Sequence, residues 1–98
     1  MATFTYRMEN VSDRHRLDSD ASSDGEEDAR LDYLEQAAVE GEVLQKQAHE
    51  VVEDLLEDAY LTNDPQAFRE RYVDGYIHGY TEELNEIRRQ KSTRQDEE

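Results

Sequence analysis

The sequence has no cysteine, no tryptophan, one proline and two lysines among its 98 residues. Without cysteine, the chain has no disulfide framework and no thiolate for zinc binding, iron–sulfur binding or nucleophilic catalysis. No run approaches the roughly 18 apolar residues of a membrane span, and the N-terminus has no apolar signal-peptide core. We therefore expect one small cytoplasmic domain with no membrane contact.

Charge of one sign dominates the composition, with 26 Asp and Glu against 11 Lys and Arg and a formal net charge of −15. Because this charge repels phosphates, we expect no direct nucleic-acid binding. Nine of the 11 basic residues are Arg, and the two lysines are Lys46 and Lys91. Abundant carboxylate with scarce lysine suggests a halophilic source, because concentrated salt screens the self-repulsion.

The acidic residues are concentrated in residues 18–58, which hold 15 acids against two bases. Within this region and just before it, residues 12–28 contain a single large apolar residue, Leu17, and no aromatic residue. Such a stretch buries too little apolar surface to offset its chain entropy. We therefore predict a disordered acidic linker at 12–28.

The N-terminal segment, residues 1–11, has two interpretations. Phe4, Tyr6 and Met8 alternate with polar residues over 3–8, which is the period of a half-buried strand. Because no other segment has the pattern of a strand, its partner would come from a second copy or from another protein. The alternative interpretation is a frayed terminus.

Two long helices are predicted over residues 29–92, which we assign as an antiparallel αα-hairpin. Apolar and small residues repeat at spacings of three and four from Ala29 to Leu61, with a seam at Leu34, Ala37, Gly41, Leu44, Ala48, Val51 and Leu55. Asp64 and Pro65 suit the cap and first position of a second helix. Its apolar arc includes Phe68, Tyr72, Val73, Tyr76, Tyr80 and Leu84. Residues 93–98 are predicted to be a disordered tail.

A single hairpin covers only part of the apolar surface of its two helices, and about 60 ordered residues make a marginal domain. Two hairpins docking into a four-helix bundle would bury that surface. The sequence therefore predicts an all-α homodimer, with docking onto a different helical protein as the alternative.

The most unusual feature of the second helix is a row of tyrosines beside two glycines: Tyr72, Gly75, Tyr76, Gly79 and Tyr80. Each helical glycine costs about 1 kcal/mol relative to alanine, so a pair of them requires a compensating reason. One interpretation is a groove that binds another protein, because Tyr offers amphipathic contact area. The other is close approach of a neighbouring helix, with Ala37, Gly41 and Ala48 on the facing seam.

Metal-ligating residues occur as two i, i+4 pairs, His49 with Glu53 and Asp74 with His78. Spaced in this way, the pairs could bind a metal across a dimer, although solvated helix-surface pairs are the more common case. The serines lie in the predicted linker and, for Ser92, next to the predicted tail, away from any rigid base, so the sequence predicts no catalytic residue. It also predicts no cofactor.

These observations favour a non-enzymatic interaction or assembly module that is a homodimer or binds an unidentified protein. Two alternatives remain open. Carboxylates along a long helix could mimic DNA and inhibit a nucleic-acid-binding protein. The other alternative is a helical bundle that binds a metal ion through His49, Glu53, Asp74 and His78.

Overall fold

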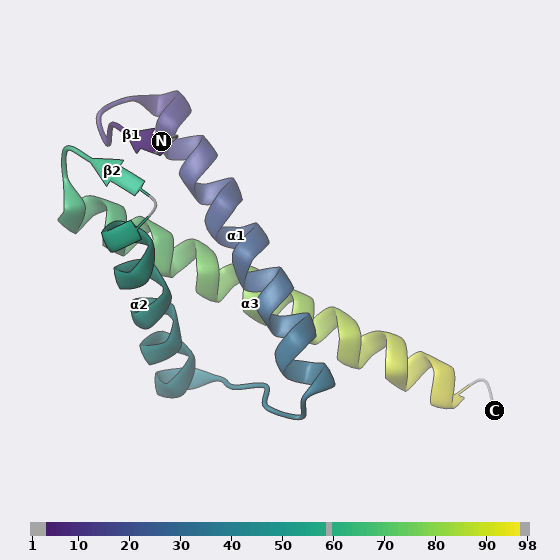
Figure 1. Ribbon diagram of the computed structural model, residues 1–98. Helices are drawn as coiled ribbons and strands as arrows, with labels where there is room; N and C mark the ends of the chain where they lie inside the picture. The colour runs from purple at the N-terminus through teal and green to yellow at the C-terminus, as the bar shows by residue number, and fades with distance from the viewer. Residues whose placement is uncertain (1–3, 59, 97–98) are drawn as a thin grey trace.

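The computed structural model of the protein describes residues 4–58 and 60–96. Its elements follow in the order β1 (Phe4–Tyr6), α1 (Val11–Leu34), α2 (Gly41–Asp58), β2 (Tyr60–Thr62) and α3 (Pro65–Asp96). Figure 1 shows α3 as the longest element, and both α1 and α2 pack against it. Helices make up most of the described chain, which confirms the predicted helical class.

The first and third helices run parallel, and the second runs antiparallel to them. Three hydrogen bonds between α1 and α3 join residues 48 positions apart, so residue numbers rise together along both helices. In α2 the order is reversed: Gln47 bonds to Tyr76, whereas Glu53, farther along α2, pairs with Arg69 near the start of α3. The most extensive packing of α3 is against α1, so a three-helix arrangement replaces the predicted two-helix hairpin.

The first departure from the sequence prediction is α1, because residues 12–28 are helical where we predicted a disordered linker. The Asn10 side chain caps this helix by accepting a hydrogen bond from the backbone N–H of Asp13. Buried positions repeat every four residues and are small after the first: Leu17, Ala21, Gly25 and Ala29. The prediction is wrong because close helix contact lets small residues contribute packing that we expected only from large ones.

The second departure is a connection at residues 35–40, inside the segment that we predicted as one helix. After α1, Gln36 has a φ of 58°, and α2 begins at Gly41 with a φ of 63°. Both angles lie in the left-handed region, where glycine has no Cβ clash. The predicted seam is therefore correct only within α2, where Leu44 and Ala48 are buried, and it fails at Leu34, which is exposed.

The third helix begins as predicted and ends later than predicted. The Asp64 carboxylate accepts a hydrogen bond from the backbone N–H of Ala67 at 3.1 Å, and Pro65 is the first helical residue. The helix continues to Asp96, so the predicted tail is helical over residues 93–96. The last two residues of that tail lie outside the described part of the chain.

The short N-terminal strand is confirmed over residues 4–6, whereas Thr3 lies outside the described residues. It pairs in parallel with β2, with Phe4 opposite Tyr60. The predicted source of its partner is wrong, because this chain supplies the second strand from a segment that we assigned to the end of a helix and the turn after it. The two strands lie together at one end of the molecule, where β1 is followed by α1 and β2 by α3 (Figure 1).

The predicted apolar arc of α3 is confirmed as the centre of the core. Four aromatic residues spaced four apart on α3 are fully buried: Phe68, Tyr72, Tyr76 and Tyr80. Successive rings are stacked with centroids 6.1–6.2 Å apart. None of the helices in the described residues combines the length and apolar character that crossing a bilayer requires.

Candidate functional site

Four tyrosine hydroxyls each donate a hydrogen bond to an aspartate of α1. The pairs, with oxygen–oxygen distances, are Tyr6 with Asp20 (2.5 Å), Tyr72 with Asp24 (2.5 Å), Tyr76 with Asp28 (2.5 Å) and Tyr80 with Asp32 (2.8 Å). The aspartates repeat every four residues on α1, as the last three tyrosines do on α3. One face of α1 therefore binds the end of β1 and one face of α3 through a row of charge-assisted hydrogen bonds, which are stronger than neutral ones.

Glycines bring the two helix backbones close enough for this row to form. A Cβ atom on Gly25 would lie 2.2 Å from the carbonyl oxygen of Tyr76, and one on Gly79 would lie 2.1 Å from that of Ser22. A Cβ on Gly75 would lie 2.8 Å from the Ala21 methyl carbon. Because non-bonded carbon and oxygen atoms do not approach this closely, positions 25 and 79 require glycine in this packing.

The second helix closes the same network from the other side. The Gln47 amide donates to the Tyr76 hydroxyl at 3.0 Å and to the Asp32 carboxylate at 3.1 Å. The backbone N–H of Val39, just before α2, donates to the Tyr80 hydroxyl at 3.1 Å. The hydroxyls of Tyr76 and Tyr80 therefore act as donor and acceptor at once, which satisfies these buried polar groups.

Burial shifts the pKa values of this network. Burial and the hydrogen bond to Asp28 raise the pKa of Tyr76 well above its ordinary value of 10.0. Burial, together with Asp32, raises the pKa of Tyr80 to about 12. Burial also raises the pKa of Asp24, and the hydrogen bond from Tyr72 only partly opposes that shift. The neutral phenol is therefore the favoured form of Tyr76 and Tyr80 in the folded protein.

The predicted partner groove is filled by this chain. Tyr72, Tyr76 and Tyr80 are fully buried, and α1 contacts both Gly75 and Gly79. The structure thus leaves no open groove at these five residues, and the close-approach interpretation explains the two glycines. The neighbouring helix is α1, however, and not the seam that contains Ala37, Gly41 and Ala48.

The predicted metal-ligating residues lie apart on the molecular surface. His49 is on α2, and Glu53 of the same helix pairs with Arg69. On α3, His78 lies 3.6 Å from Glu82, and Asp74 is exposed. Among the residues that the structure describes, no three His, Asp or Glu side chains gather to hold a metal ion.

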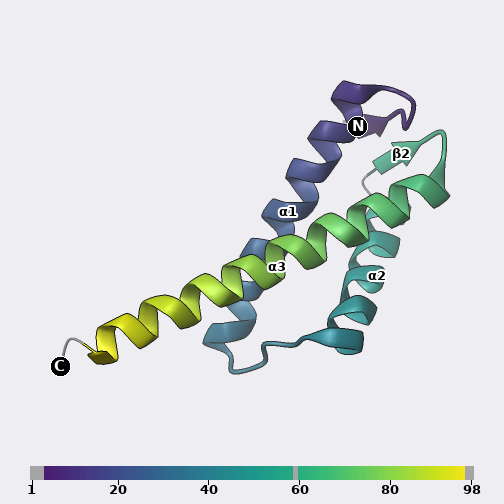
Figure 2. The same ribbon diagram turned by 180° about the vertical axis from the view of Figure 1, so that it is seen from behind.

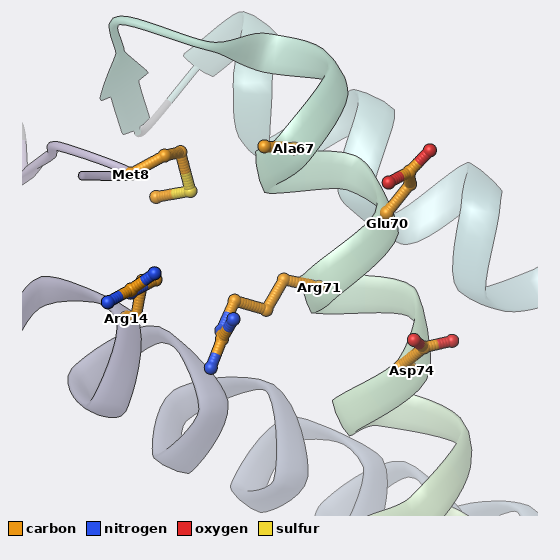
Figure 3. A pocket seen from close by; sticks show the side chains of 6 residues that line it. All are labelled: Met8, Arg14, Ala67, Glu70, Arg71 and Asp74. Atoms are coloured by element: carbon orange, nitrogen blue, oxygen red, sulfur yellow. The ribbon is translucent and has the colours of Figure 1, made fainter. Parts of the chain in front are cut away.

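A hollow lies between the turn after β1, the start of α1 and the first half of α3. Figure 3 shows Arg14 and Arg71 reaching into the space between the two helices, with Met8 above them. Asp18 holds Arg71 through two hydrogen bonds of 2.8 and 2.9 Å. The other lining residues are Ala67, Glu70 and Asp74. The lining holds no Ser, Thr, Cys or His that could act as a nucleophile.

Large apolar side chains are exposed at the end of the molecule where α1 meets α2. Here we define the loop end as residues 31–43. The exposed fractions are 52% for Leu31, 78% for Leu34 and 60% for Val43. Among the described residues, one other large apolar side chain is exposed, that of Val11 at the start of α1. A hollow beside Leu34 is also lined by Tyr33, Gln36, Ala38, Arg88 and Lys91. The Lys91 ammonium lies 4.9 Å from the Tyr33 ring centroid, a cation–π contact.

Sequence reasoning missed the aspartates of α1 as specific contact residues. A signal was present, because Asp20, Asp24, Asp28 and Asp32 repeat with the four-residue spacing of the tyrosine row. Residues spaced four apart lie on one face of a helix, so the two matching repeats indicate two helix faces that fit each other.

Comparison with protein-family models, with curated proteins and with solved structures gives no match for this chain.

Proposed function

We propose that the protein is a non-enzymatic protein–protein interaction module that assembles as a homodimer through its loop end. The observation that supports this proposal is the exposure of Leu31, Leu34 and Val43 at one end of the molecule. Removing apolar surface from water lowers the free energy by about 25 cal/mol per Å², so a surface of this kind favours association.

The shape of the loop end also supports association. Leu34 is the most exposed of these large side chains, and it borders a hollow whose lining combines the Tyr33 ring and Ala38 with the polar side chains of Gln36, Arg88 and Lys91. In an isologous dimer the same patch serves both subunits, so Leu34 of one copy would enter the hollow of the other. A homodimer would also help a small domain to bury more of its apolar surface.

The experiment compares two substitutions of exposed apolar residues by analytical ultracentrifugation. We expect the wild-type protein to sediment as a dimer and Leu34→Lys to sediment as a monomer, because the new cation would be desolvated in a hollow that Arg88 and Lys91 already line. Val11→Lys is the matched control: Val11 is 56% exposed but lies at the far end of α1, so this variant should remain dimeric. A monomeric wild type, or a dimeric Leu34→Lys variant, would contradict the proposal.

The DNA-mimic alternative has less support from the surface of α1. Its four regularly spaced aspartates accept hydrogen bonds from tyrosines and therefore do not form a free row of charges. On α2, the helix with several exposed carboxylates, Lys46 interrupts such a row between Glu42 and Glu50. Binding of the purified protein to a basic DNA-binding protein, in competition with duplex DNA, would favour this alternative.

A further inference from the structure

The last part of α3 extends beyond the other helices and carries charge opposite to that of the rest of the chain. Here we define the arm as residues 85–96. Figures 1 and 2 both show α3 continuing past the end of α1 towards the C-terminus. The arm holds four basic and two acidic residues, a net charge of +2, whereas the other 86 residues have a net charge of −17.

The arm lacks the apolar surface that stabilises a helix by packing. Ile87 is its single large apolar residue, and Arg88, Arg89, Gln90 and Lys91 are exposed. An isolated helix of about 12 residues is only marginally stable in water, because packing supplies most helix stability in proteins. Arg88 and Arg89 form exposed ion pairs within the chain, with Glu40 at 3.7 Å and with Glu86 at 3.2 Å. Exposed pairs of this kind contribute little to stability, so a further surface of opposite charge would stabilise the arm.

A second copy of the chain offers such a surface on α2. Four exposed carboxylates of this helix have no ion pair among the described residues: Glu42, Glu50, Asp54 and Glu57. At a rise of 1.5 Å per residue, the 12-residue arm is about 18 Å long and α2 about 27 Å long, so the arm can lie along α2. We infer that in the homodimer the arm of each copy lies along α2 of the other and pairs with these carboxylates.

This inference rests on the proposed homodimer and adds a salt-dependent contact to it. The apolar loop end would supply contact area, and the two arms would supply electrostatic complementarity, which sets register and association rate more than total affinity. At molar ionic strength the Debye length is about 3 Å, so the contribution of exposed pairs should then disappear.

The first test uses the only two lysines of the chain as a matched pair. Lys91→Gln and Lys46→Gln make the same side-chain change and give the same net charge, but Lys91 is on the arm, where it also lines the loop-end hollow, and Lys46 is on α2. In about 0.1 M KCl we expect Lys91→Gln to raise the dimer Kd by roughly two- to fivefold. Lys46→Gln should leave the Kd unchanged or lower it, because it removes a cation from the face that receives the arm. In about 1 M KCl the two variants should have the same Kd.

The second test changes the acidic face and separates local pairing from global repulsion. Glu50→Gln with Asp54→Asn reduces the negative charge of the protein and would strengthen a dimer that is limited by repulsion alone. We expect this variant to weaken the dimer in low salt. The matched control, Glu26→Gln with Glu27→Gln on α1, should weaken it in neither salt. Circular dichroism verifies that each variant is folded.

The outcomes distinguish the two proposals. A wild-type protein that stays monomeric in both salts overturns the homodimer and the arm contact together. A wild-type dimer in which Lys91→Gln and Lys46→Gln have the same Kd in low salt overturns the arm contact alone. A stronger dimer in the Glu50→Gln, Asp54→Asn variant also overturns the arm contact alone.

Discussion

The hydroxyl of Tyr76 lies 2.5 Å from a carboxylate oxygen of Asp28, although 48 residues separate the two in the chain. The same separation recurs one turn earlier and one turn later along both helices. A constant separation means that α1 and α3 are parallel and in register over these turns. The acidic residues of α1 thus have a structural role that net charge alone does not reveal.

The closest helix contact predicts a large effect of a single methyl group. We expect Gly25→Ala and Gly79→Ala each to lower the free energy of unfolding by roughly 3 kcal/mol, because the new Cβ would meet backbone atoms at 2.2 and 2.1 Å. This loss exceeds the gain of about 1 kcal/mol in helix propensity. Chemical denaturation measures the change.

Two variants serve as controls for the glycine prediction. Gly75→Ala should cost less, because its Cβ would meet the methyl group of Ala21 and not a backbone atom. Ser23→Ala changes an exposed position of α1 and should stay within about 0.5 kcal/mol of wild type. If Gly25→Ala and Gly79→Ala are as stable as wild type, the close packing of α1 on α3 is wrong.

The hydroxyl of Tyr76 should contribute measurably to stability. It donates to Asp28 and accepts from Gln47, so Tyr76→Phe leaves two polar groups without this partner. We expect a loss of roughly 2 kcal/mol in the free energy of unfolding. Tyr33→Phe is the matched control, because none of the described residues forms a hydrogen bond with the Tyr33 hydroxyl, and it should be close to neutral. Equal stability of the two variants would argue against the tyrosine–aspartate row.

The raised pKa values of Tyr76 and Tyr80 predict unfolding in alkali. In the unfolded chain both hydroxyls ionise near pH 10, whereas in the folded protein Tyr80 ionises near pH 12 and Tyr76 also above its ordinary range. The stability that depends on the neutral phenols is therefore fully present below pH 10 and is lost as the pH rises through 12. Circular dichroism and tyrosinate absorbance should change together over this window.

The control for this titration is a variant with both tyrosines replaced by phenylalanine. Such a protein should be less stable at neutral pH but should lose less stability between pH 10 and pH 12, because two of the shifted groups are gone. If all tyrosines of the wild-type protein titrate near pH 10 without loss of helix, the burial of these hydroxyls is contradicted.

The net charge of −15 predicts that salt stabilises the fold. Raising KCl from about 0.1 M to molar concentrations should increase the Tm by about 5–15 °C, because screening weakens the repulsion among exposed carboxylates. Thermal melts followed by circular dichroism give this dependence. The Glu26→Gln, Glu27→Gln variant carries less negative charge and should show a smaller increase. A Tm independent of KCl would contradict both this prediction and the hypothesis of a halophilic source.

The sequence supported correct predictions where stability is local. The Asp64–Pro65 start of α3 depends on a cap and a ring that act on adjacent residues, and both features are visible in the sequence. Large apolar residues at spacings of three and four likewise identified the buried faces of α2 and α3, including Leu44 and Leu84. The sequence left two interpretations of the candidate groove open, because a row of tyrosines beside glycines fits an external partner and an internal helix equally well.

By itself, the sequence therefore determined the helical class, the start of α3 and the face that α3 buries. Each of these follows from a local feature: the cap of a helix or the spacing of its apolar residues. Only the tertiary structure decided that residues 12–28 form a helix and that this helix covers the tyrosines. A segment rich in aspartate and serine has little local reason to fold. Its helix is stabilised by Gly25 and its neighbours packing against α3, and by hydroxyl donors 48 residues away in the chain.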